Sequence, residues 1–155
     1  MPKRSAGLLV HRRSEVGQIE VVLVHPGGPF WANKDDGAWS IPKGELEAGE
    51  DPLTVAQREF DEEIGQPAPA GPPTSLGEIT QSGGKRVIAW AVEGDLDVSN
   101  IASNTFEMEW PPGSGQMQEV PEVDRAEWFT LVIARAKILK SQQPLLDRLE
   151  EVIGA

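Results

Sequence analysis

The sequence contains no cysteine and no tyrosine among its 155 residues. Without cysteine the chain has no disulfide framework, no thiolate metal site and no cysteine nucleophile. Long hydrophobic runs are missing too, because the longest aliphatic stretch, residues 21–24, is far shorter than the roughly 20 residues that cross a bilayer. Residues 1–10 also lack the apolar core and the small-residue cleavage site of a signal peptide. We therefore expect a soluble, cytoplasmic protein.

Basic residues are scarce as well. Lysine and arginine total 14 against 25 aspartates and glutamates, which gives a formal charge of −11. A chain of this charge repels nucleic-acid backbone and anionic lipid, so we expect neither an extended nucleic acid nor a membrane as partner. A small polyanionic substrate is compatible with the charge if divalent cations lie between the two. The length and the 39% hydrophobic residues fit a single domain over residues 1–155.

The first third of the chain has the pattern of β-strands. Residues 5–12 and 19–24 are rich in β-branched and aliphatic side chains, and Gly17 between them favours a hairpin. The breakers that follow predict a loop over residues 30–38. A short strand is predicted over residues 39–41.

The pattern then changes to that of an amphipathic helix. Asp51 and Pro52 are typical of a helix start, and Gly65 is typical of a helix end. Between them, one apolar stripe is formed by Leu53, Ala56, Phe60 and Ile64.

The second half of the chain alternates predicted strands with breakers and ends in helices. A Pro-rich connector over residues 67–73 comes first. The sequence then predicts strands over residues 74–81, 85–92, 104–110 and 126–129, a loop over 111–121, and helices over 131–140 and 144–153. Strands on both sides of a central helix, with helices at the end, indicate an α/β sandwich with a mixed β-sheet between helices.

The predicted helix over residues 52–64 has a second, acidic face. Glu59, Glu62 and Glu63 are spaced i, i+3 and i+4 and therefore lie on neighbouring turns. At about 100° per residue, Glu62 lies opposite the apolar stripe and Glu63 lies at its edge. Carboxylates at this spacing repel one another, and a hard cation such as Mg²⁺ would relieve the repulsion. From these residues alone, a solvated acidic helix face is the alternative.

The residues around this helix form a longer pattern. Gly44 is followed by Glu50 and then by residues 58–65, Arg-Glu-Phe-Asp-Glu-Glu-Ile-Gly. This arrangement resembles the Nudix box, the signature of the Nudix hydrolase family, at every specified position but the last. That position is usually aliphatic and is Gln66 here, beyond the predicted helix end, where the departure affects local packing rather than chemistry. The resemblance implies the Nudix α/β/α sandwich for nearly the whole chain.

The resemblance also implies roles for the residues of the box. With Mg²⁺ or Mn²⁺ as cofactor, the metal ligands and catalytic carboxylates of the family map onto the carbonyl of Gly44 and onto Glu59, Glu62 and Glu63. Arg58 is placed with the catalytic residues, and Glu50 looks like its supporting partner, because a guanidinium can hold a carboxylate through two hydrogen bonds. A pair that only ties the loop to the helix is the alternative.

Two residues outside the acidic face are candidate substrate contacts. Lys43 precedes Gly44 and could bind phosphate as a point charge, although an exposed loop lysine is the alternative. Trp31, in the predicted loop, is the better candidate for stacking on a nucleobase, whereas we expect Trp39 in the core. The alternative for Trp31 is an aromatic side chain that folds back onto the domain.

Nudix enzymes often recruit one more acid from outside the box, as a metal ligand or a general base. The candidates are Glu107, Glu109, Glu119 and Glu122. The first two share one face of the predicted strand, and the last two lie in the loop predicted after it. Nothing in the sequence chooses among them. The two histidines, His11 and His25, lie far from the box without a ligand motif, and each is interpreted as a strand-end residue.

The resemblance implies a metal-dependent pyrophosphohydrolase that cleaves a phosphoanhydride bond in a nucleoside diphosphate-linked compound. The chain lacks the tyrosine of one dinucleoside-polyphosphate branch, and Gln81 and Ser82 stand where ADP-ribose-specific members carry a proline. We favour a nucleoside triphosphate or dinucleoside polyphosphate as substrate, with diphosphoinositol phosphates and nucleotide sugars as alternatives. A Nudix-fold binding or regulatory module with little turnover is a further alternative, and a homodimer stays open.

Overall fold

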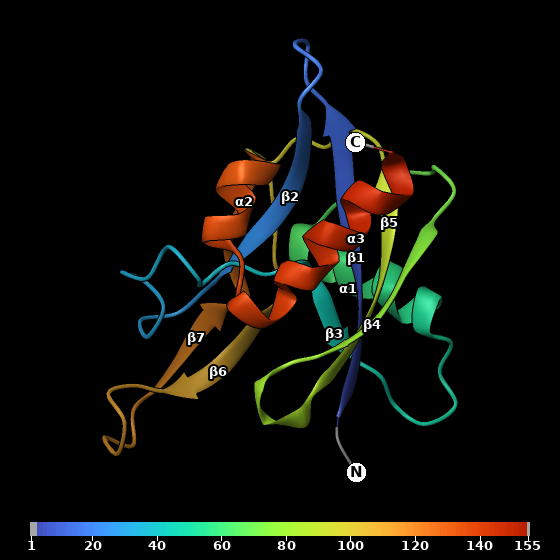
Figure 1. Ribbon diagram of the computed structural model, residues 1–155. Coiled ribbons are helices and arrows are strands. Elements are labelled where there is room, and N and C mark those ends of the chain that lie inside the picture. Colours follow the sequence, from blue (N-terminus) through green and yellow to red (C-terminus); the bar gives the residue numbers. More distant parts are fainter. Residues whose placement is uncertain (1–2, 155) are drawn as a thin grey trace.

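A mixed β-sheet between two helical layers forms the framework of the computed structural model, which describes residues 3–154 (Figure 1). The strand order is β4-β5-β1-β2-β8, with β3 paired to β1. Strand β1 is antiparallel to β2 and parallel to β5. The strands are β1 (Arg4–Arg13), β2 (Ile19–Pro26), β3 (Lys43–Glu45), β4 (Thr74–Thr80), β5 (Arg86–Glu93) and β8 (Val123–Thr130). A separate hairpin, β6 (Thr105–Glu109) and β7 (Met117–Pro121), projects away from the sheet (Figure 1).

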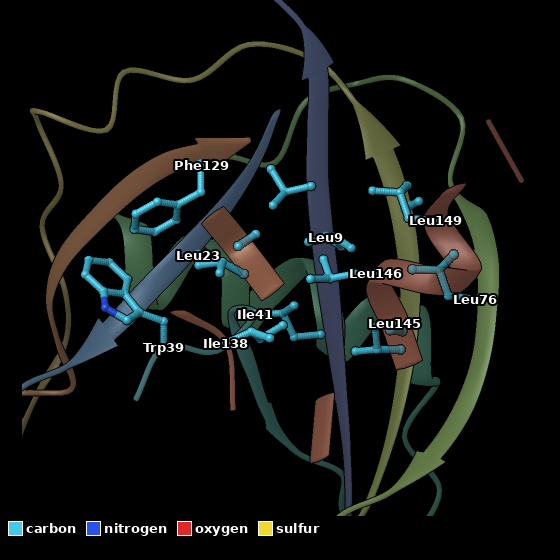
Figure 2. Close-up of a cluster of buried hydrophobic side chains, with 14 of the residues drawn as sticks. Leu9, Leu23, Trp39, Ile41, Leu76, Phe129, Ile138, Leu145, Leu146 and Leu149 are labelled. Carbon is cyan, nitrogen blue, oxygen red and sulfur yellow. The ribbon is translucent and has the colours of Figure 1, made fainter. Parts of the chain in front are cut away.

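Helices cover both faces of the sheet. The helical segments are α1 (Pro52–Ile64), α2 (Leu131–Lys137) and α3 (Gln143–Ile153), with short 3₁₀ turns η1 (Ser82–Gly84) and η2 (Lys140–Gln142). Figure 2 shows Leu145, Leu146 and Leu149 of α3 packed beside Leu9 of β1, whereas Phe60 of α1 belongs to the core on the opposite face. None of the helices formed within residues 3–154 has the length and apolar character needed to cross a membrane. The predicted α/β sandwich is confirmed.

Strand β1 is the centre of the sheet and is buried on both faces. Leu8 and Val10 face the core beneath α1, and Leu9 faces the core beneath α3, because successive side chains alternate across a strand. The predicted hairpin to β2 is confirmed. Gly17 lies in its turn with φ 83°, a conformation that glycine adopts without steric penalty.

Helix α1 begins and ends at the predicted residues. The Asp51 side chain accepts a hydrogen bond from the Thr54 N–H (3.1 Å), and Pro52 occupies the first turn. Gly65 ends the helix in the left-handed conformation, and its N–H donates to the Asp61 carbonyl (2.7 Å). The Gln66 side chain donates to the carbonyl of Asp97 (2.8 Å), so the departure from the box pattern anchors the end of the helix to the following segment.

The strand predicted over residues 39–41 is wrong. Trp39 and Ser40 form isolated bridges only, and the strand β3 begins two residues later, at Lys43. Pro42 has no N–H to donate to a ladder, which separates the bridges from β3. Strand β3 lies close against β1 because Gly7 has no side chain, and a Cβ there would come within 2.6 Å of the Pro42 carbonyl oxygen.

The loop predicted over residues 111–121 is too long, and the helix predicted over residues 131–140 is also too long. Residues 117–121 form β7, which pairs with β6 and places Glu119 opposite Glu107. The turn residues of this hairpin span only residues 111–116, so residues 117–121 are free to pair with β6. Helix α2 ends at Lys137, and η2 follows it before α3.

The cap of α1 is expected to stabilise the fold measurably. Asp51→Ala removes the acceptor for the Thr54 N–H and is expected to lower the free energy of unfolding by about 1 kcal/mol in urea titrations. Gln57, exposed on the same helix, is the matched control, and Gln57→Ala is expected to change that free energy by less than about 0.5 kcal/mol. Equal losses in the two variants would contradict a role for the cap.

Candidate functional site

Helix α1 lies against β3, and this contact places the acidic face of the helix. The backbone N–H of Lys43 donates to Oε2 of Glu63 (2.8 Å), which holds that carboxylate in a buried position. The Glu59 carboxyl group lies directly over Gly44, where a Cβ would overlap it. A glycine at position 44 therefore lets the Glu59 carboxyl group approach the backbone of β3.

The predicted pair of Glu50 and Arg58 is confirmed as a contact. Nη1 of Arg58 donates to Oε2 of Glu50 (2.8 Å), and the Glu47 N–H donates to the other carboxylate oxygen (2.9 Å). The hydrogen bond from Arg58 lowers the pKa of Glu50. The same guanidinium lies 3.9 Å from Oε1 of Glu59, so the pair joins the loop before α1 to the acidic face.

A fourth carboxylate joins the box glutamates from outside the box. Glu122 lies between β7 and β8, and its N–H donates to the Asn104 carbonyl (2.9 Å). The Asn104 N–H donates in turn to the Glu62 carbonyl (2.9 Å), which ties the end of α1 to the base of the hairpin.

Among the four candidate acids, Glu122 is the one that lines the same cleft as Glu63. Glu107 and Glu119 face each other across the hairpin, and Glu109 accepts a hydrogen bond from the Gly113 N–H (2.6 Å) at the hairpin turn.

The carboxylates lie close enough to oppose one another's ionisation. Burial raises the pKa of Glu63 to about 8, and the nearby charges of Glu122 and Glu59 add to the increase. Burial also raises the pKa of Glu59, where Glu62 is the next contributor, and the pKa of Glu122. Burial lowers the pKa of the Lys43 ammonium group. Without a cation, this cluster is strained electrostatically.

The donor set fits a hard divalent cation. Carboxylate and backbone carbonyl oxygens are the ligands that Mg²⁺ and Mn²⁺ prefer, and the raised pKa values show mutual repulsion that such a charge would relieve. Within residues 3–154, no three carboxylate or imidazole side chains already converge on one point as a metal site. Binding of a cation by three of these carboxylates would therefore require them to move toward one another.

A cleft of about 210 Å³ opens beside these carboxylates. Its charged part is formed by Lys43, Glu63 and Glu122. Its apolar wall includes Val24, Trp31, Ala38, Ile41, Val123 and Leu139. The structure thus brings both predicted substrate contacts, Lys43 and Trp31, into one cleft with Glu63 and Glu122, whereas Glu59 and Glu62 do not line it. Trp39 lies in the core as predicted.

The interpretation of His25 as a strand-end residue is correct but misses its connections. The ring is fully buried, with Nδ1 2.8 Å from Oδ1 of Asp124 and Nε2 2.6 Å from the Lys34 carbonyl. These partners lie 99 and 9 residues away along the chain, so no local pattern could have indicated them.

Comparisons with known proteins agree with the box. A family model described as NUDIX domain matches residues 1–149. The chain is 40% identical over 67 residues to an RNA pyrophosphohydrolase of Rhodospirillum rubrum, covering 41% of this chain and 38% of that protein. It is 31% identical over 109 residues to an 8-oxo-(d)GTP phosphatase of Mycolicibacterium smegmatis, covering 68% of this chain and 31% of that protein. The chain thus spans less than two fifths of the length of each of these curated relatives.

Solved structures share the fold. A C. elegans Ap4A hydrolase in a binary complex superimposes with a TM-score of 0.67 at 21% identity, covering 97% of this chain and 98% of the other. At this identity the likeness shows the fold alone.

The raised pKa of Glu63 predicts how stability varies with pH when metal is absent. An unfolded chain loses this proton near the ordinary pKa of 4.5, whereas the folded chain keeps it until about pH 8. The contribution of protonated Glu63 is therefore complete below about pH 4.5 and is lost as the pH rises to about 8. At about 1.4 kcal/mol for each pH unit, the loss amounts to several kcal/mol.

Thermal unfolding in EDTA from pH 5 to 8.5 checks this expectation. As the pH rises, the Tm of the wild type is expected to fall more than the Tm of Glu63→Gln. The glutamine side chain of the variant does not titrate in this range, so it loses no proton. A difference in Tm that is independent of pH would contradict the assignment of a buried, protonated Glu63.

Proposed function

Because the chain belongs to the NUDIX domain family, we propose that it is a metal-dependent pyrophosphohydrolase acting on a nucleoside triphosphate or dinucleoside polyphosphate. The observation that carries the proposal is the cleft in which an apolar wall adjoins Lys43, Glu63 and Glu122. A nucleotide has the matching form, with a flat apolar base at one end and a polyanionic phosphate chain at the other. In the reaction, water attacks one phosphorus of a phosphoanhydride bond, the bond to the bridging oxygen breaks, and two phosphorylated products are released.

Mg²⁺ or Mn²⁺ is the cofactor that the donor set favours. The residues that would hold it are the Gly44 carbonyl, Glu59, Glu62 and Glu63. When bound, the cation neutralises charge on the diphosphate and lowers the pKa of a coordinated water.

The remaining steps belong to the side chains of the cleft. Glu122, whose pKa is raised by burial and by Glu62, is suited to accept the proton of the attacking water and hold it. Lys43 lies at the charged end of the cleft, where a phosphate oxygen would offset the effect of burial on its ammonium group. Arg58 is exposed and engaged with Glu50, so we infer that it positions Glu59 and does not touch the substrate.

The substrate class is supported by the size and charge of the site. A cleft of about 210 Å³ is of a size to take one nucleotide unit at a time. The net charge of −11 also opposes a long phosphate backbone. The curated relatives named RNA pyrophosphohydrolase and 8-oxo-(d)GTP phosphatase point to nucleotides as the substrate class. Trp31 lines the apolar wall, which supports it as the residue that contacts the base.

The proposal is tested by a screen with nucleoside triphosphates, dinucleoside polyphosphates, nucleotide sugars and diphosphoinositol phosphates. Each compound is incubated with Mg²⁺ or Mn²⁺, and the products are identified by mass. We expect turnover of at least one nucleoside or dinucleoside polyphosphate, with none in EDTA. Binding of nucleotides without turnover would favour a regulatory module instead.

Substitutions in the acidic cluster test the site. Glu62→Gln and Glu63→Gln are each expected to lower kcat by about 100-fold or more while the protein stays folded, because each removes a carboxylate charge from the cluster. Asp61→Asn, at an exposed position on the same helix, is the matched control and is expected to keep the wild-type rate. Near-wild-type rates for both glutamine variants would rule out this site.

The choice of the extra acid is tested separately. Glu122→Gln is expected to reduce kcat about tenfold or more, because a cleft-lining proton acceptor is lost. An equal loss in Glu119→Gln, on β7, would contradict the selection of Glu122.

A further inference from the structure

His25 connects two segments that form separate parts of the cleft wall. Its Nδ1 lies 2.8 Å from the carboxylate of Asp124, which directly follows the cleft residues Glu122 and Val123. Its Nε2 lies 2.6 Å from the carbonyl of Lys34, in the loop that carries Trp31. The ring has no exposed surface, whereas the Asp124 side chain is 32% exposed.

The contact with Lys34 leads directly to Trp31. The Lys34 N–H donates to the Trp31 carbonyl (2.9 Å), so the same peptide segment receives a hydrogen bond from His25 and donates one to Trp31. The Lys34 ammonium group lies 4.6 Å from the ring centre of Phe30, which packs edge-on against the Trp31 ring. A displacement of Lys34 would therefore move Trp31, the aromatic residue on the apolar wall of the cleft.

Both hydrogen-bond partners of His25 are acceptors. The two contacts use different ring nitrogens, Nδ1 toward the carboxylate and Nε2 toward the carbonyl. The far end of the same loop is held independently, because the Lys137 ammonium group lies 2.6 Å from Asp35 and 3.0 Å from Asp36. His25 thus holds the loop three residues after Trp31, and the contacts of Lys137 hold the far end of the loop separately.

We propose that His25 is a positioning residue for nucleotide specificity: by joining Asp124 to the Lys34 carbonyl, it holds Trp31 in place to receive the nucleobase. The proposal rests on the proposed function, since it assigns Trp31 as the contact for the base. His25 itself touches neither the phosphates nor the acidic cluster. Loss of the hydrogen bond from His25 to Lys34 therefore weakens recognition of the base and leaves the hydrolytic step intact.

Two substitutions separate the two nitrogens of the ring. The amide nitrogen of asparagine takes the place of Nδ1, so His25→Asn keeps a donor for Asp124 and loses the bond to Lys34. The amide nitrogen of glutamine takes the place of Nε2, so His25→Gln keeps the donor for Lys34 and loses the bond to Asp124. Both variants remove the same buried ring, so both are expected to lower the Tm by a similar amount.

Kinetics then distinguish positioning from general destabilisation. With the nucleotide identified in the screen, His25→Asn is expected to raise KM about tenfold with kcat changed less than about twofold, as loss of a stacking contact would. His25→Gln is expected to stay within about twofold of the wild-type KM. Lys137→Gln, which releases only the far end of the loop, is the matched control and is also expected to keep the wild-type KM.

A double-mutant cycle with Trp31→Ala tests the connection itself. If His25 acts through Trp31, the double variant His25→Asn with Trp31→Ala has the same KM as Trp31→Ala alone. Independent, multiplying effects on KM would overturn the proposal. Equal increases in KM for His25→Asn and His25→Gln would also overturn it, because the bond to Lys34 would then have no special part.

Two measurements that need no turnover separate this proposal from the proposed function. Amide hydrogen exchange over residues 30–36 is expected to be about tenfold faster in His25→Asn than in His25→Gln. Equilibrium binding of a nucleoside triphosphate is expected to weaken about tenfold in His25→Asn only. If wild type binds nucleotide without hydrolysing it, the hydrolase proposal fails and these two results still decide the role of His25. If wild type binds no nucleotide, both proposals are wrong.

Discussion

The site depends on one hydrogen bond between the acidic helix and the strand before it. The Lys43 N–H donates to Glu63, and this bond lets a glutamate lie buried at the edge of the apolar face of α1. A carboxylate in that position is poorly solvated, and Glu59 and Glu122 add their own charge, so its pKa rises. The folded chain therefore holds a cluster whose repulsion would be relieved by a divalent cation. The acidic net charge and a polyphosphate substrate are compatible for the same reason.

Connections between distant segments give this cluster its surroundings. Asn104 joins the end of α1 to Glu122 through two backbone hydrogen bonds, and His25 joins the residues after Glu122 to the loop of Trp31. The acidic end and the apolar end of the cleft are thus linked through hydrogen bonds between segments that are distant in sequence. The two hydrogen bonds of His25 fix the relative position of these segments, because a buried polar group that loses its hydrogen-bond partner is strongly unfavourable. A base and a phosphate chain would then be held at a set distance from each other.

Local patterns in the sequence predicted α1 well and other elements less well. The cap at Asp51, the end at Gly65 and the spacing of Glu59, Glu62 and Glu63 depend on neighbours within a few residues, and the structure agrees with them. The strand predicted over residues 39–41 was wrong, because the approach of β3 to β1 depends on Gly7, far away in sequence. The strand β7 was not predicted because residues 117–121 have no strong strand pattern of their own and form a strand by pairing with β6. The turn residues at 111–116 favoured a loop over the whole segment.

By itself, the sequence determined the family, the helix that carries the carboxylates, the pair of Glu50 and Arg58, and the set of acids from which a fourth could come. Only the tertiary structure showed that Glu122 lines one cleft with Glu63, Lys43 and Trp31, and gave His25 its two partners. The physical reason is the range of the interactions. A helix face and its caps follow from residues three or four apart, whereas a cleft wall is assembled from strands and loops that meet only when the sheet has formed.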